Sequence, residues 1–148
     1  MQKTETTVKE VSKPDVSPMG DKVPLYSSRP AAGFPAPGDD QVERVLDIND
    51  LVVKHPTSTF FVRVEGDSME GAGIFSGDVL VIDRAIEPKD GHIVVAAVNG
   101  EMVVKRLYAD GGVLQLHSEN EEYAPITVSA EEDCVVWGVV AGSVRQLL

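Results

Sequence analysis

The chain has 148 residues, 43% of them hydrophobic, a proportion typical of one globular domain with a core of ordinary size. Its formal net charge is -11, and residues 1–32 hold five of the 13 basic residues but only four of the 24 acidic ones. The acidic excess therefore lies in the rest of the chain, where it repels phosphate backbones and argues against direct sequence-specific binding of DNA. A single cysteine, Cys134, excludes an internal disulfide and favours a reducing compartment.

Neither a membrane anchor nor a metal site is expected. No run of about 18 apolar residues occurs and no signal peptide is visible, so we expect a cytoplasmic protein. The three histidines are isolated and lack the spacing to cysteine or glutamate that metal ligands show, so we predict no metal site. Cys134 lies in an apolar run and is predicted to pack in the core.

Residues 1–37 show little apolar periodicity and are rich in threonine, serine, lysine and proline. Such a segment buries too little surface to offset the entropy lost on ordering, so we predict a flexible N-terminal arm. Two apolar groups interrupt it, Val23–Tyr26 and Ala31–Phe34. They belong either to a loose linker or to a strand that docks in a groove. The arm is too short and too rich in proline to form a helix-turn-helix domain.

Residues 38–148 are predicted to form one mostly β domain. A short helix is expected from Asp47 to His55, with Asp47 as its N-cap, Leu51 and Val52 facing inward, and Pro56 ending it. Six strand patterns follow, separated by turns rich in glycine, asparagine and aspartate: Phe60–Val64, Val79–Asp83, Ile93–Val98, Met102–Tyr108, Val113–His117 and Val135–Val140. Six short strands and one short helix predict a twisted, barrel-like architecture.

A candidate nucleophile lies where the first of these strands stops. The pattern Phe60–Val64 runs into Gly66-Asp67-Ser68 and ends there. A serine at a strand-to-turn junction has an exposed hydroxyl and backbone N–H groups close by, which a nucleophile and its oxyanion pocket require. We therefore regard Ser68 as the candidate nucleophile, with the backbone N–H groups of Asp67 and Ser68 as oxyanion donors. The alternative is a serine that only caps a turn, the commoner role for a lone Gly-Asp-Ser.

A candidate general base lies further along the chain. Lys105 is in the second arm of a hairpin whose turn is Asn99-Gly100. Alternation places Val103, Lys105 and Leu107 on one face of that arm. Burial disfavours a charged amine, so a lysine held between aliphatic neighbours can be neutral and accept a proton from a serine hydroxyl. The alternative is a lysine on a solvated face beside Arg106.

These motifs occur in an order that resembles a known family. The run Gly66-Asp67-Ser68-Met69, then Gly73-Ile74, Gly77-Asp78 and Val104-Lys105-Arg106-Leu107, is similar to the LexA-type self-cleaving Ser/Lys peptidases, and most to their UmuD-type mutagenesis branch. The similarity extends from about Gly33 to the C-terminus, and Ala32-Gly33 looks like the cleavage site of the family. The resemblance implies a LexA/UmuD-type fold, with Ser68 as nucleophile and Lys105 as base. The lack of a helix-turn-helix domain favours the UmuD-type branch over the repressors.

The resemblance also implies partners and a cellular role. Family members cleave themselves on meeting the RecA–single-stranded-DNA filament, and the shortened homodimer serves a UmuC-type translesion polymerase in the SOS response. No cofactor is implied. Two alternatives stay open: a dimeric binding module that keeps the fold without the chemistry, and a repressor-like fragment that regulates transcription. Ser68 and Lys105 together argue against the first, and the proline-rich arm argues against the second.

Overall fold

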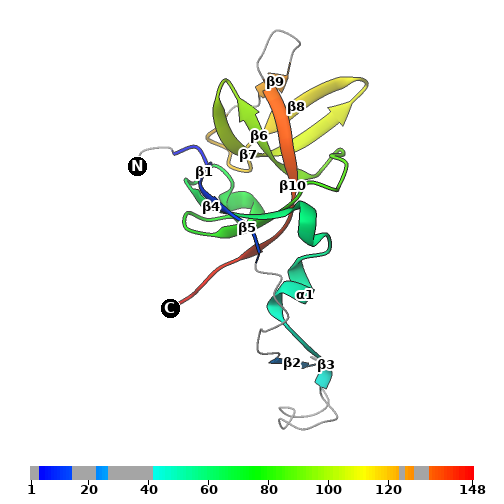
Figure 1. The fold of residues 1–148 in the computed structure, drawn as a ribbon. Coiled ribbons are helices and arrows are strands. Elements are labelled where there is room, and N and C mark those ends of the chain that lie inside the picture. Colours follow the sequence, from blue (N-terminus) through cyan, green and yellow to red (C-terminus); the bar gives the residue numbers. More distant parts are fainter. Residues whose placement is uncertain (1–3, 15–22, 27–41, 124–125, 129–133) are drawn as a thin grey trace, which may run out of the picture.

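A computed structural model describes residues 4–14, 23–26, 42–123, 126–128 and 134–148. Its main sheet contains β1 (Thr7–Ser12), β4 (Thr59–Glu65), β5 (Val79–Asp83), β6 (Ile93–Val98), β7 (Glu101–Asp110), β8 (Val113–His117), β9 (Ile126–Val128) and β10 (Cys134–Val144). These strands are antiparallel, in the order β1-β4-β5-β10-β6-β7-β8-β9. A small sheet of β2 (Val23–Tyr26) and β3 (Val42–Leu46) lies apart from the main one (Figure 1).

The main sheet closes into a ring because β1 pairs with two strands that are far apart in the sheet order. β1 runs antiparallel to β4, and Thr7 also pairs with Val103 of β7. The ring therefore passes from β1 through β4, β5, β10, β6 and β7 back to β1. Bulges in the long strand β10 let it bend and pair with β5 along one half and with β6 along the other. The prediction of a mostly β, barrel-like domain is confirmed.

Strands β6 and β7 are covered on both faces. The larger core cluster includes Val95 and Val104, whereas the second includes Val94 and Leu107. Because successive side chains of a strand point to opposite faces, these neighbours pack in different clusters. Burial on both sides removes the middle of β7 from water, whichever way its side chains point. The second cluster also receives Cys134, which is half-buried, as its apolar setting predicted.

The six predicted strands are all present, three with the predicted bounds and three longer at their ends. The three strands β1, β3 and β9 were not predicted. β2 has the bounds of the apolar group Val23–Tyr26, for which a strand was one of two predicted alternatives, and it pairs with β3. β1 falls within the polar segment 1–37, and its strand conformation comes from backbone pairing with β4 rather than from an apolar alternation. The proposed division into an arm, 1–37, and a domain, 38–148, stays a prediction.

The predicted helix is shorter than expected. α1 spans Ile48–Val52, and Asp47 caps it as predicted, within a capping box that includes Asp50. The inward orientation of Leu51 is wrong, because its side chain is 40% exposed. A helix of five residues is too short to lay an apolar face on the barrel. The chain instead buries Val53, after the helix, and Pro56 opens a short 3-10 helix, Pro56–Ser58.

An ion pair between a buried carboxylate and an exposed arginine joins the end of β10 to the turn before β5. The Asp78 carboxylate, 1% exposed, accepts hydrogen bonds from Nε and Nη2 of Arg145 at 2.7 and 2.8 Å and from the Phe75 backbone N–H at 2.8 Å. Arg145 also donates to the carbonyl oxygen of Gly73. The bonds from Arg145 hold the pKa of Asp78 below its usual range, against the opposing effect of burial.

We expect Asp78→Ala to lower the free energy of unfolding at pH 7 by about 2 kcal/mol, the scale of hydrogen bonds to a charged group. A carboxyl group whose pKa is lower in the folded state stabilises the fold above its unfolded value of about 3.9, and this stabilisation is lost as the pH falls through the folded value. In urea unfolding, the free energies of the variant and the wild type should therefore differ fully at pH 7, and this difference should become smaller below about pH 4. The exposed Asp110→Ala is the control. A difference that stays constant with pH would contradict a charge-dependent pair.

Candidate active site

Ser68 follows β4 on a sharp turn. The chain leaves the strand at Glu65 and passes through Gly66, whose φ of 122° lies in a region that favours glycine. The Ser68 hydroxyl is not exposed, contrary to our expectation: the residue is 0% exposed, and its Oγ accepts a hydrogen bond of 2.8 Å from the backbone N–H of Thr6. It is covered because the N-terminal segment, which showed no strand pattern, lies over it.

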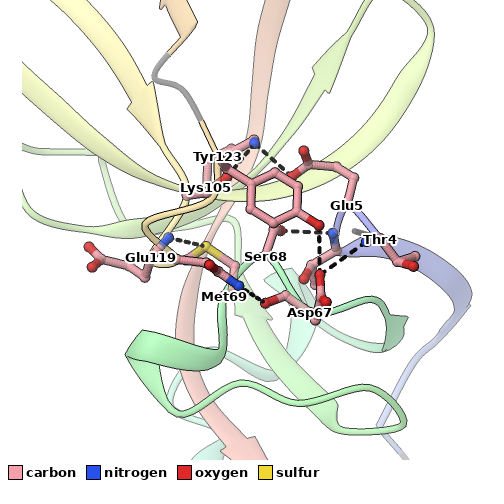
Figure 2. Close-up of polar contacts among 11 residues, drawn as sticks. Thr4, Glu5, Asp67, Ser68, Met69, Lys105, Glu119 and Tyr123 are labelled. Carbon is pink, nitrogen blue, oxygen red and sulfur yellow. Dashed lines mark hydrogen bonds and ion pairs between the residues drawn. The ribbon is translucent and has the colours of Figure 1, made fainter. Parts of the chain in front are cut away.

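Lys105 lies in the buried middle of β7. It is 1% exposed, and Val103 and Leu107 on the same face are buried as well, so the alternative of a solvated lysine is wrong. Its Nζ donates to Ser118 Oγ at 2.7 Å. The same Nζ forms an ion pair of 2.6 Å with Glu5 Oε1 (Figure 2). Among the described residues, Lys105 and Ser68 thus have different partners and do not hydrogen-bond to each other.

The two side chains nevertheless meet at one dipeptide, Glu5-Thr6. Ser68 Oγ accepts a hydrogen bond from the backbone N–H of Thr6. Lys105 forms its ion pair with Glu5, the residue before Thr6 (Figure 2). One of the predicted oxyanion donors is engaged here too, because the N–H of Asp67 donates to the carbonyl oxygen of Thr4 at 2.7 Å. The structure therefore brings Ser68, Lys105 and the Asp67 N–H around one extended segment of chain.

A third segment, 118–123, supports the site and was missed from the sequence. The Asn120 amide donates to the Asp67 carbonyl oxygen at 3.0 Å, and the Tyr123 hydroxyl donates to Asp67 Oδ1 at 2.6 Å. The bonds from Tyr123 and from the Thr4 backbone lower the pKa of Asp67, whereas burial and the Asp67 carboxylate raise the pKa of Tyr123. These contacts fix the turn that carries Ser68.

One signal in the sequence could have located Ser118. The turn Gly111-Gly112 sets the β7–β8 register, in which Arg106 pairs with His117. One step further along the same register places Ser118 opposite Lys105. Glu5, by contrast, had no such signal, because no turn or alternation relates it to the lysine.

Ala32 and Gly33, the predicted cleavage site, lie outside the described residues. Within the described part of the chain, no group of three potential metal ligands occurs. The helices found in these residues are too short to span a bilayer.

Comparison with known proteins identifies the family. A family model described as Peptidase S24-like matches residues 24–141, which include Ser68 and Lys105. The chain belongs to this family. The Peptidase S24-like region begins after β1, so the segment that covers Ser68 lies outside the match. The LexA- and UmuD-type resemblance seen in the motifs is thereby confirmed.

Three similar proteins illustrate the range of the Peptidase S24-like relatives. The chain is 42% identical over 118 residues to Protein ImpA of Escherichia coli, which covers 79% of each chain. It is 38% identical over 122 residues to Protein MucA of Escherichia coli, which covers 82% of this chain and 83% of MucA. It is 39% identical over 116 residues to the LexA repressor of Shewanella oneidensis, but spans only 56% of that repressor. Family membership supports a peptidase.

Proposed function

We propose that this chain is a UmuD-like, self-cleaving serine peptidase of the SOS response that cuts its own Ala32–Gly33 bond with Ser68 and Lys105. One observation carries the proposal. Ser68, in the turn after β4, and Lys105, on β7, contact adjacent residues of a single extended segment, with Ser68 Oγ at 2.8 Å from a backbone nitrogen. A peptide backbone is therefore held at contact distance from the nucleophile.

The site binds the segment through its backbone, as a peptidase binds its substrate. We define the peptide site by three groups: the Asp67 N–H, Ser68 Oγ and the Val104 N–H. These contact the carbonyl oxygen of Thr4, the N–H of Thr6 and the carbonyl oxygen of Thr6, respectively. All three contacts are with backbone atoms, so another extended segment can make them whatever its side chains. The Ala32–Gly33 segment is the substrate we assign to this site.

The proposed reaction has two stages. The neutral amine of Lys105 takes the proton of the Ser68 hydroxyl as its oxygen attacks the carbonyl carbon of Ala32. The N–H groups of Asp67 and Ser68 stabilise the oxyanion of the tetrahedral intermediate. Lys105, now an ammonium, donates its proton to the amine of Gly33 as the peptide bond breaks. Water then hydrolyses the Ala32–Ser68 ester with the same lysine as base.

The arm is long enough to present this bond. About 14 residues separate Gly33 from Asp47, and a fully extended chain of that length spans up to about 45 Å. The bond can therefore reach Ser68 of its own chain or of a partner chain. Family membership and the motif resemblance further support a homodimer and cleavage stimulated by the RecA–single-stranded-DNA filament. They also support a role for the shortened product, residues 33–148, as an accessory subunit of a UmuC-type translesion polymerase.

Alkaline incubation tests the bond. We expect the full chain, held near pH 10 where lysine amines begin to lose their charge, to yield a fragment that begins Gly33-Phe34-Pro35, identified by intact mass and N-terminal sequencing. Gly33→Val should slow cleavage strongly, because a branched side chain crowds the attacking serine. Gly38→Val, in the same segment, should cleave as wild type. A fragment with any other N-terminus would overturn the assignment of the bond.

A further inference from the structure

The segment that fills the peptide site is not the assigned substrate. Residues 4–6 and the strand β1 that follows them lie upstream of the region matched by the family. We propose that residues 4–12 are an internal competitor of the Ala32–Gly33 segment, and that Glu5 holds Lys105 in a form unable to act as a base. This inference rests on the proposed function and adds a regulatory contact to it.

Backbone atoms of Thr4 and Thr6 occupy all three groups of the peptide site. The carbonyl oxygen of Thr4 accepts a hydrogen bond of 2.7 Å from the Asp67 N–H, and the Thr4 N–H donates one of 3.1 Å to Asp67 Oδ1. Thr6 donates to Ser68 Oγ at 2.8 Å and accepts from the Val104 N–H at 3.0 Å. The Asp67 N–H, Ser68 Oγ and the Val104 N–H would each have to contact an incoming substrate instead. The two segments therefore exclude one another.

Glu5 adds a chemical block to the steric one. Its carboxylate lies 2.6 Å from Lys105 Nζ, and the lysine side chain is 2% exposed. An ion pair requires the ammonium form of the amine, whereas a general base must be neutral. With Glu5 in place, Lys105 has no lone pair to receive the Ser68 proton. Withdrawal of residues 4–12 removes the carboxylate and the steric obstacle together.

One contact of the competitor is unfavourable, and its second half lies at the surface. The hydroxyl of Thr6 is buried, and among the described residues it has no hydrogen-bond partner, which is unfavourable. The Ala32–Gly33 pair carries no such hydroxyl. Within the described part of the chain, β1 beyond Thr7 pairs only with β4, with a register shift between Val8 and Glu10, and residues 9–12 are exposed. Val8 packs against the larger core cluster, whereas the contacts that oppose release of residues 9–12 themselves lie at the surface.

A conservative variant tests the chemical block. Glu5→Gln keeps the shape of the side chain and removes its charge, so we expect self-cleavage of the full chain to accelerate by about tenfold or more. Glu87→Gln is the control: Glu87 is exposed between β5 and β6, outside both the site and the competitor, so this variant should leave the rate unchanged. Rates are followed by intact mass from neutral to alkaline pH.

A reversible cross-link tests the steric block. Glu10 pairs with Arg63 across β1 and β4, and both side chains are exposed. Cross-strand Cα atoms lie about 4.5–5.5 Å apart, within the range for a disulfide. In a Cys134→Ser background, Glu10→Cys with Arg63→Cys should form one, verified by thiol titration. The oxidised chain should not cleave detectably, and reduction should restore cleavage.

The outcomes separate this inference from the proposed function. Faster cleavage by Glu5→Gln, together with loss of cleavage in the oxidised cross-linked chain, supports the competitor. If wild type cleaves and neither change alters its rate, the competitor is overturned and the proposed function stands. If neither wild type nor any variant cleaves at alkaline pH, both fail together.

Discussion

Ser68→Ala is expected to abolish self-cleavage at every pH while the barrel stays folded. Removing the nucleophile of a serine peptidase costs on the order of 10⁶-fold in rate, which leaves nothing detectable. Among the described residues, the hydroxyl accepts a hydrogen bond only from the Thr6 N–H, so its loss should cost no more than about 1–3 kcal/mol of stability. Intact mass after prolonged incubation near pH 10 measures the first effect, and urea unfolding measures the second.

A second serine serves as the control for this variant. Ser143 lies in β10, is exposed and has no part in the proposed chemistry, so Ser143→Ala should cleave as wild type. Normal processing of Ser68→Ala would remove the serine-peptidase mechanism altogether. It would leave the dimeric binding module as the better description of the chain.

Lys105→Arg is expected to be inactive at every pH. A guanidinium stays charged throughout the accessible range, so it can keep an ion pair with Glu5 but cannot accept the Ser68 proton. Lys105→Ala should be equally inactive, since it has no amine. Wild-type cleavage should rise with pH and level off once the lysine is neutral. Parallel pH–rate profiles of the three proteins make the measurement, with exposed Lys89→Arg as the unaffected control.

Two results would remove Lys105 from the mechanism. One is cleavage by the arginine variant, and the other is a wild-type rate that is flat between about pH 7 and pH 10. Another titratable group would then have to act as base. The histidines are poorly placed for this within the described contacts: His55 contacts Asp83, His92 the backbone of Lys89, and His117 the side chain of Gln115.

The sequence by itself predicted the local features of this fold. Alternation and turn residues located six strands, because both depend on neighbouring residues in the chain. The Asp47 cap followed from the same kind of local signal. The junction after β4 indicated Ser68 as a candidate nucleophile, and the apolar neighbours of Lys105 indicated a candidate base. The β7–β8 register would also have placed Ser118 opposite Lys105.

Only the tertiary structure decided what those residues contact. Residues 4–12 reach the Ser68 turn and Val104 through backbone hydrogen bonds between segments distant in sequence. Such bonds are indifferent to side-chain identity, so they left no periodic pattern that could predict β1 or the burial of Ser68. Glu5 looked like any other charge of a polar segment. Its contact with Lys105 exists because β1 closes the ring between β4 and β7, a long-range pairing that local sequence does not encode.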